Sequence, residues 1–299
     1  MSIHKELSVF FVNYNLKEDI IKLIKKIPED IKVLIIDNSN DEDNVSSLSR
    51  HNNITVIKNK NNSGQVGGIN TGLKNIQTKY AIYSDVDVDL DWSEVLKFYN
   101  YVEKINRDDF GIIVPQHPWG NQPDSYYHEK KYNDKYTERM KIVTGHFIFF
   151  NMEIVKEHGG YDDKIWMYYD ETDYCLKLDR LNVKILTLLD ANVPHKGHDI
   201  VKKSYTYKNT KYENIILLRH WHMGWSKFYY FKKNYNYFFA LKKTFKDLVF
   251  SIIKCSAYLF VNKYKFLINY NKLAGLVNSF FLKESWKRPE HYNKLKVKR

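Results

Sequence analysis

Four carboxylates alternate with apolar residues in segment 84–91, Ser-Asp-Val-Asp-Val-Asp-Leu-Asp, directly after the strand-like run 80–83. Carboxylates gathered at the end of a buried strand repel one another, and a divalent cation relieves that repulsion. Mg²⁺ binds oxygen ligands, usually one or two protein carboxylates together with substrate phosphates. The segment therefore indicates a site for a metal and a phosphorylated ligand. The alternative is an exposed acidic loop in which Asp91 caps a helix that begins near Trp92.

Asp37 is a second candidate, because it closes the apolar run 33–36. A carboxylate at a strand end can accept hydrogen bonds from a nucleotide base or a ribose. The alternative is an Asx-turn, in which the Asp side chain bonds to its own backbone two residues later. Taken alone, the residue favours the turn.

A glycine-rich segment, 62–72, reads Asn-Ser-Gly-Gln-Val-Gly-Gly-Ile-Asn-Thr-Gly. Free amide groups at a helix start attract anions, although the spacing matches neither the dinucleotide fingerprint nor the phosphate loop. Glycine inside a helix costs about 1 kcal/mol relative to alanine. The glycines therefore predict either close packing or the close approach of a ligand.

The acids Asp170 and Glu171 follow an aromatic stretch, 166–169, at the expected start of a helix. One interpretation is a general base whose pKa is modulated by the helix N-terminus. The alternative is a first turn in which acids are favoured by the helix dipole, with Asp173 paired to Lys177.

His195 lies in the loop 194–198, Pro-His-Lys-Gly-His, after an expected strand. A histidine there can be a third metal ligand or a phosphate contact. The alternative is an ordinary loop histidine with neither role.

Strand and helix signals alternate through the first 115 residues. Short apolar runs at 7–12, 33–36, 54–57, 80–83 and 111–114 predict buried strands, with helical apolar spacing between them. This alternation predicts an α/β fold with a mostly parallel sheet and helices on both faces. Ligands of such sheets bind beyond the carboxyl ends of the strands. By that rule residues 13–15, 37–39 and 85–89 share one edge.

The remaining pattern is less regular. Segment 116–141 is polar and irregular, 142–150 and 183–189 resemble strands, and 170–180 resembles a helix. From about residue 212 the chain becomes helical, basic and aromatic. We expect a catalytic domain at residues 1–210 and a basic helical extension at 211–299.

Composition narrows the class of protein. The chain has 299 residues and a net charge of +12, but residues 1–200 carry 25 Lys or Arg against 31 Asp or Glu, whereas residues 201–299 carry 22 against 4. Cys175 and Cys255 have no metal-type spacing and offer no disulfide framework, which suits a reducing compartment. We expect neither a signal segment nor a membrane-spanning helix.

The basic tail has three possible partners. Helical spacing, with lysines between, is followed by Phe245, Leu248, Val249, Ile252, Ile253 and Leu259 or Phe260. This pattern fits an amphipathic helix on an anionic membrane surface. The helix could instead pack on the catalytic domain. A nucleic-acid-binding tail, with aromatic residues that stack on bases, is the competing class of function.

The order of these motifs resembles glycosyltransferase family 2, the GT-A fold group, and its rhamnosyltransferase-like bacterial members in particular. The resemblance spans residues 7 to 234. It is carried by segments 12–15, 36–39, 62–72, 85–90, 144–147, 160–162, 170–173, 195–197 and 219–229. Each segment is short, and their shared order and spacing make the resemblance strong.

The resemblance implies roles for individual residues. Asp87, with Asp85 and His195, would bind Mg²⁺ or Mn²⁺ at the donor diphosphate. The residues that would bind the nucleotide sugar are Asn13, Asn15, Asp37, Gly64, Asn70 and Asp85, and those on the acceptor side are Thr144, Gly145, His146 and Trp166. The family usually has Glu-Asp where this chain has Asp170-Glu171, so either acid could be the base.

The implied activity is an inverting transfer of a sugar from a UDP- or dTDP-sugar to a hydroxyl of a growing surface glycan. We expect a glycan or lipid-linked glycan acceptor, no nucleic acid partner, and a cytoplasmic enzyme bound peripherally to the inner face of the bacterial cytoplasmic membrane. The reversed acid pair leaves open a catalytically inactive relative that binds sugar nucleotides.

Overall fold

The computed structural model describes residues 3–39, 45–105, 109–116, 137–139, 143–195 and 210–293. The loop expected at 116–141 contains a short strand, and its residues 117–136, 140 and 141 lie outside the described residues, as do residues 196–198 of the histidine loop. The strands are β1 (Leu7–Asn13), β2 (Lys32–Asp37), β3 (Ile54–Lys58), β4 (Tyr80–Ser84), β5 (Phe110–Pro115), β6 (Thr137–Arg139), β7 (Phe147–Asn151) and β8 (Lys184–Leu188).

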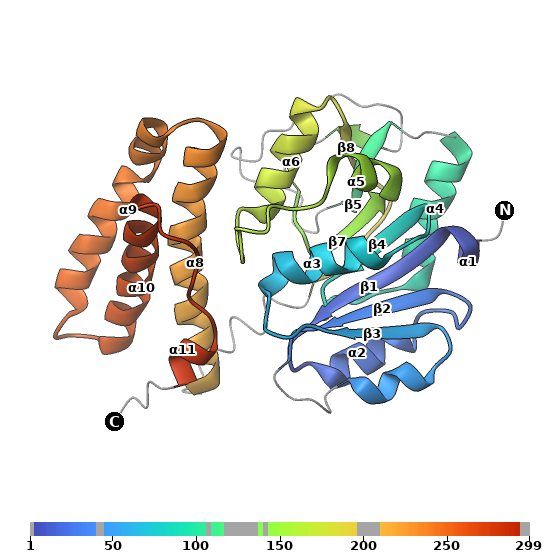
Figure 1. Cartoon of the computed structure of the whole chain (residues 1–299), viewed down its shortest axis with the longest axis horizontal. Coiled ribbons are helices and arrows are strands. Elements are labelled where there is room, and N and C mark those ends of the chain that lie inside the picture. The colour runs from blue at the N-terminus through green and yellow to red at the C-terminus, as the bar shows by residue number, and fades with distance from the viewer. Residues whose placement is uncertain are drawn as a thin grey trace. The chain divides into compact units, whose positions relative to one another are not determined.

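The helices alternate with these strands and then follow one another. They are α1 (Ile3–Glu6), α2 (Lys17–Ile24), the 3₁₀ turn η1 (Ser46–Arg50), α3 (Gly64–Asn75), α4 (Trp92–Ile105), α5 (Met152–His158), α6 (Asp170–Arg180), α8 (Thr210–Asn234), α9 (Tyr237–Tyr258), α10 (Lys263–Phe280) and α11 (Glu290–Asn293). Figure 1 shows the sheet with its flanking helices and the separate set of long C-terminal helices.

The chain divides into two compact units. The first contains Met1–Tyr161 and Tyr174–His198, and the second contains Asp162–Asp173 and Asp199–Arg299. The segment 162–173 therefore belongs with the C-terminal helices, whereas the sequence placed a single boundary after residue 210. The domain boundary after residue 210 stays a prediction.

The first unit is built on one 8-stranded sheet with the order β3-β2-β1-β4-β7-β5-β8-β6. β1 pairs in parallel with β2 and β4, and β2 with β3. β7 is antiparallel to both β4 and β5, and β6 is antiparallel to β8. The expected mostly parallel α/β sheet is confirmed. In register, Asn13 faces Asp37, so the ends of β1 and β2 meet at one edge.

Helices cover both faces of this sheet, as the continuous apolar strands require. On one face α2 and α4 contribute Ile20, Leu23 and Phe98 to a buried cluster with Val9 and Phe11. On the other face α3 approaches β1 so closely that a Cβ on Gly72 would lie 2.3 Å from the Phe10 ring, and one on Gly68 would lie 2.6 Å from Val12. Close packing therefore explains these glycines of the 62–72 segment.

The second unit is helical. α10 packs against α8 and α9, and α8 against α9, as Figure 1 shows. The backbones of α8 and α10 come so close that a Cβ on Gly275 would lie 1.9 Å from the Trp221 carbonyl oxygen. Among the described residues, none of the helices is both long enough and apolar enough to span a bilayer.

Candidate active site

Two loops that are distant in sequence are joined at the end of β4. The Asp85 amide donates to the His146 carbonyl (2.8 Å), and the Asp89 amide donates to the Pro194 carbonyl (2.8 Å). Val88 and His195 form an antiparallel bridge. The bond to His146 fixes the acidic loop after β4 against the segment before β7. The contacts with Pro194 and His195 fix it against the segment after β8 and place His195 among the carboxylates.

Asp85, Asp87 and His195 form a candidate metal site. His195 Nε2 lies 3.0 Å from Asp87 Oδ1 and 3.6 Å from Asp85 Oδ2. The three residues are half-buried, and one ligand atom from each lies within 4.8 Å of the others. Carboxylate oxygens suit Mg²⁺ and Mn²⁺, and histidine is a common metal ligand. The residues therefore fit the divalent cation that the sequence predicts.

The electrostatics of Asp87 favour its ionised form. Burial acts to raise the pKa of this carboxyl, but the hydrogen bond and charge of His195, with a further contribution from His146, hold the pKa below its ordinary value. The rings of His146 and His195 stack with centroids 5.3 Å apart. Because a metal ligand must be deprotonated, Asp87 is ready to bind a cation at neutral pH.

Asp85 is oriented by a residue that the sequence analysis missed. The Tyr83 hydroxyl donates to Asp85 Oδ1 at 2.6 Å. Tyr83 is the penultimate residue of β4 and is buried beside Phe10. Its place in the strand was predicted, but alternation along a strand cannot show that a tyrosine hydroxyl reaches a carboxylate two residues later.

Asp37 lies at the neighbouring strand end and is almost fully buried. Its Oδ1 accepts from Asn13 Nδ2 (3.0 Å) and from the Ser39 amide (3.0 Å), while Lys58 Nζ lies 3.4 Å from Oδ2. The bond from Ser39 is the Asx-turn considered above. Asn13 and Asp37 are thus brought together as expected, and their contact with a nucleotide stays a prediction.

The other residues expected to bind the nucleotide sugar are Asn15, Gly64 and Asn70. The Asn15 amide donates to Ser39 Oγ (2.8 Å), and Gly64 opens α3 with its amide bonded to Asn62 Oδ1 (2.9 Å). Asn70 is buried, and its amide group bonds to both backbone groups of Tyr161, at 3.0 Å and 2.9 Å. These bonds give Asn70 a structural role, in addition to the nucleotide-binding role that stays a prediction.

The expected acceptor-side residues fall in both units. Thr144, Gly145 and His146 precede β7 in the first unit, where His146 Nε2 lies 3.1 Å from the Val193 carbonyl. Trp166 belongs to the second unit, where it is buried against Leu217 and Leu218 of α8. It stacks on His222 with centroids 4.5 Å apart. Contact between any of these residues and an acceptor stays a prediction.

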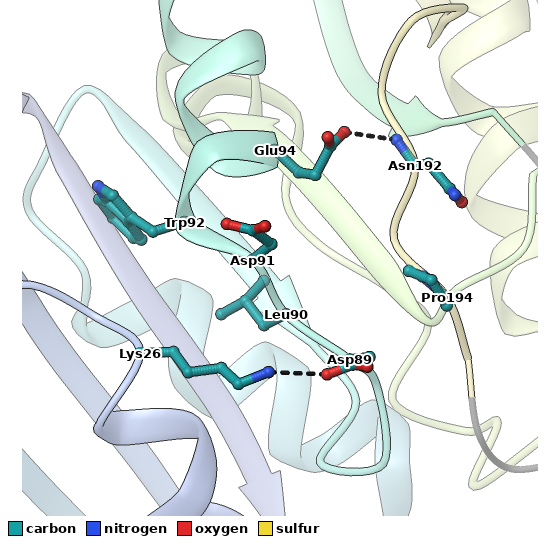
Figure 2. Close-up of a pocket in the computed structure, with 8 residues that line it drawn as sticks. All are labelled: Lys26, Asp89, Leu90, Asp91, Trp92, Glu94, Asn192 and Pro194. Carbon is teal, nitrogen blue, oxygen red and sulfur yellow. Dashed lines mark hydrogen bonds and ion pairs between the residues drawn. The ribbon is translucent and has the colours of Figure 1, made fainter.

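The outer part of the acidic loop borders an open cavity of about 610 Å³. Figure 2 shows Lys26 pointing to Asp89, at 2.7 Å, and Glu94 pointing to the backbone nitrogen of Asn192. Asp91 Oδ1 accepts from the Ser93 amide (2.9 Å), as a helix cap does. Asp85 and Asp87 are not among the residues that line the cavity, so the loop divides into an inner metal-type pair and an outer structural pair.

The acid pair Asp170–Glu171 opens α6 and belongs to the second unit. Asp170 is 3 % exposed, and its Oδ2 has no hydrogen-bond partner among the described residues. Burial, and then the charge and hydrogen bond of Glu171, raise the pKa of Asp170 well above its usual range. Both effects favour the protonated form of Asp170, the more buried of the two carboxyls.

The segment before this pair is strained and tightly held. Tyr168 and Tyr169 both have positive φ angles, 65° and 62°, which are costly for bulky residues. Arg219 of α8 bonds to the Tyr168 hydroxyl and lies over its ring. Arg219 belongs to a stretch that carried the family resemblance, but the sequence assigned it no role.

A charged network holds the same segment at both ends. Lys233 of α8 pairs with Asp162 (2.8 Å) and with the buried Asp173 (2.6 Å), and Asn234 Nδ2 donates to Asp173 (2.7 Å). The expected pairing of Asp173 with Lys177 is replaced, since Lys177 bonds to the Gly159 and Gly160 carbonyls. The network therefore ties the segment that carries Asp170 and Glu171 to α8.

Comparison with known proteins agrees with this architecture. The family model for glycosyl transferase family 2 matches residues 8–159. The hexosyltransferase Agl10 of low-salt glycan biosynthesis from Haloferax volcanii is 21% identical over 199 residues, which cover 60% of this chain and 64% of that protein. The chain thus spans somewhat less than two thirds of that relative's length.

Solved structures share the fold at low identity. The mannosyltransferase PcManGT from Pyrobaculum calidifontis, solved with GDP-Man and Mn²⁺, has a TM-score of 0.53 and 15% identity, with 93% of this chain and 88% of that chain covered. Residues 1–349 of TarS from S. aureus give 0.52 and 14%, with 90% of each chain covered. GalNAc-T7, solved with UDP, GalNAc and Mn²⁺, gives 0.51 and 18%, with 64% and 43% covered.

The residues matched by the family model include Asp37, Asp85 and Asp87, the carboxylates expected to bind the nucleotide sugar and the metal. The similar solved structures agree with the observed fold. The chain belongs to glycosyl transferase family 2 and has a GT-A fold.

Proposed function

We propose that the protein is an inverting, metal-dependent glycosyltransferase that moves a hexose from a nucleotide-diphosphate sugar to a hydroxyl group. The observation that carries this proposal is the convergence of Asp85, Asp87 and His195 beyond β4. A divalent cation bound there would neutralise negative charge on the departing diphosphate. Asp37 and Asn13, at the adjacent strand ends, are the proposed contacts of the nucleoside.

Glu171 is the proposed general base. In the transfer step the acceptor hydroxyl loses its proton to the Glu171 carboxylate as its oxygen bonds to the anomeric carbon. The bond from that carbon to the diphosphate oxygen breaks, and its electron pair leaves with the nucleotide. We assign the base to Glu171 because it is the less buried of the two, whereas burial and the charge of Glu171 favour the protonated form of Asp170. Its role is to hold one proton beside Glu171 and keep the pair at a single negative charge.

The donor is proposed to be a UDP- or dTDP-sugar, and the acceptor a glycan or a lipid-linked glycan of a bacterial surface polymer. Agl10 is a hexosyltransferase of glycan biosynthesis, and PcManGT and GalNAc-T7 were solved with GDP-Man and with UDP and GalNAc. These relatives support a nucleotide-sugar donor. We also propose that the enzyme works at the inner face of the cytoplasmic membrane, where a lipid-linked acceptor is presented.

Donor turnover tests the proposal. Hydrolysis or transfer of a panel of nucleotide sugars is measured with Mn²⁺ and with EDTA, after a thermal-shift screen has identified the donor that stabilises the protein. The expected result is turnover that requires Mn²⁺ and is abolished in Asp87→Ala. The Asp89→Asn variant is the matched control, because Asp89 lies in the same loop but pairs with Lys26. Full turnover in EDTA, or in Asp87→Ala, would remove the metal role.

A further inference from the structure

Helix α9 places its small residues, rather than its large apolar ones, against the rest of the second unit. Ala240, Thr244 and Ser251 are its buried residues. Leu248 lies toward the same side, where it packs on the cluster of Phe228, Ala240 and Leu276. The apolar face expected from the sequence was therefore partly misplaced, since Leu248 belongs to the inner side of the helix.

The opposite side of α9 is apolar and exposed. Phe238, Phe245, Val249, Ile252 and Ile253 are 81%, 62%, 36%, 48% and 55% exposed. Their spacing of seven, four, three and one residues puts them on one side of an α-helix. A helix of a globular protein normally turns such a stripe to the core. This exposed side of α9 is therefore suited to bind another molecule.

The turn between α9 and α10 extends this stripe. Leu259, Phe260 and Val261 follow one another there, and Phe260 is 93% exposed. We call the five residues on α9 together with these three the α9 apolar face. Scattered exposed apolar residues need no explanation, but eight of them on one helical hairpin indicate an interaction site.

Positive charge lies beside the α9 apolar face. Six exposed lysines lie on α9 or at the start of α10: Lys242, Lys243, Lys246, Lys254, Lys263 and Lys265. Asp247 is the single acid in residues 237–280. It is turned away, because it pairs with Lys227 (2.5 Å) and Lys272 (2.6 Å) inside the unit. The face therefore presents cations that no acid on the same two helices neutralises.

We propose that the α9 apolar face docks on an anionic lipid bilayer, with its aromatic and aliphatic side chains at the boundary between headgroups and acyl chains and its lysines against the lipid phosphates. A bilayer supplies the apolar layer and the negative charge together. A second copy of the chain, docked through the same face, would bring two sets of lysines together and be repelled. This inference deepens the proposed function, since it names the surface that meets the membrane, and it rests on that function for the acceptor.

Vesicle co-sedimentation of the full chain tests whether the α9 apolar face binds a bilayer. The assay contains neither nucleotide sugar nor metal, so its outcome is independent of the turnover assay. The probes are vesicles of phosphatidylcholine alone and vesicles that also contain phosphatidylglycerol, at low salt. We expect pelleting only with the anionic vesicles, and weaker pelleting as salt rises. No pelleting with anionic vesicles would overturn the proposal.

Two variants with matched controls locate the contact. Lys243→Gln/Lys246→Gln/Lys254→Gln is expected to weaken partition by about fivefold per lysine, whereas Lys25→Gln/Lys32→Gln/Lys60→Gln, on exposed lysines of the first unit, is a charge-matched control expected to weaken it less. Phe245→Ser/Ile252→Ser should lose vesicle binding while its circular dichroism stays that of the wild type. Equal losses in the two lysine variants, or unchanged binding by Phe245→Ser/Ile252→Ser, would refute this surface.

A site-specific probe reports insertion independently of these losses. Phe260→Trp adds an indole at the exposed turn, and we expect brominated lipid in anionic vesicles to quench its added emission. Two outcomes would contradict the proposal. One is vesicle binding without quenching at this position. The other is a concentration-dependent dimer that Phe245→Ser/Ile252→Ser abolishes, with no vesicle binding.

Discussion

His222 provides a quantitative test of how the second unit holds the Trp166 segment. The imidazole is fully buried, stacks on Trp166, and its Nε2 lies 2.9 Å from the Lys287 carbonyl while its Nδ1 lies 3.3 Å from Ser285 Oγ. This pairing suits a neutral ring that donates from Nε2 and accepts at Nδ1. Burial lowers the pKa of His222 to about 3, and the nearby Arg288 and Lys287 charges act in the same direction.

The sign and size of the pH effect follow from these values. Because the folded pKa lies below the unfolded value of about 6.5, the unfolded state binds more protons between the two. The contribution of His222 to stability is therefore complete above pH 6.5 and is lost as the pH falls toward 3. The loss approaches about 1.4 kcal/mol per pH unit, so it reaches about 2 kcal/mol at pH 5.

Urea unfolding followed by tryptophan fluorescence at pH 7 and pH 5 measures this effect. Glutamine can form both hydrogen bonds of His222 without titrating, so His222→Gln is expected to lose about 2 kcal/mol less stability between the two pH values than the wild type. His51→Gln, on the exposed surface of the first unit, is the control and should keep the wild-type difference. The same pH dependence in His222→Gln and the wild type would refute a buried neutral imidazole.

Three further predictions address the acid pair, the lysine that positions it, and the packing of α3 on the sheet. Glu171→Gln should lower kcat by about 10²–10⁴-fold, and Asp170→Asn by much less; equal modest losses in kinetic assays would remove the base assignment. Lys233→Met leaves the buried Asp173 without its cation and should lower the free energy of unfolding by about 3 kcal/mol and reduce kcat. Lys232→Met is the neighbouring control, and equal stability of the two variants would contradict this role of Lys233. Gly72→Ala should destabilise the sheet unit by about 1–3 kcal/mol through overpacking on Phe10, as thermal unfolding can measure, and a neutral effect would show that α3 moves freely.

Most of the first unit could be predicted because its strands are continuous apolar runs and its helices keep one apolar stripe. β7 could not be recognised as antiparallel, since its five residues are all buried and its apolar run looks like those of its parallel neighbours. Direction in a sheet depends on the path of the connecting chain, which local spacing does not encode.

The candidate site was predictable by residue type but not by geometry. The Asp85–Asp87 spacing pointed to a metal, yet the approach of His195 depends on main-chain bonds across more than a hundred residues, such as that from Asp89 to Pro194. The burial of Asp170 likewise arises from packing and not from its neighbours in sequence. On α9 the periodicity identified an amphipathic helix but not which side packs, because Ala240, Thr244 and Ser251 leave no apolar signal.

Direct Mn²⁺ binding tests the central claim most simply, by following the loss of the free-ion signal in electron paramagnetic resonance during a titration of the full chain. We expect the wild type to bind one Mn²⁺ for each chain. The Mn²⁺ affinity should fall at least tenfold in Asp87→Asn and His195→Ala, because the loss of a second-shell partner alone lowers metal affinity about 10–100-fold, and it should be unchanged in Asp89→Asn. Equal Mn²⁺ affinity in the wild type and Asp87→Asn, with and without a nucleoside diphosphate, would contradict this metal site.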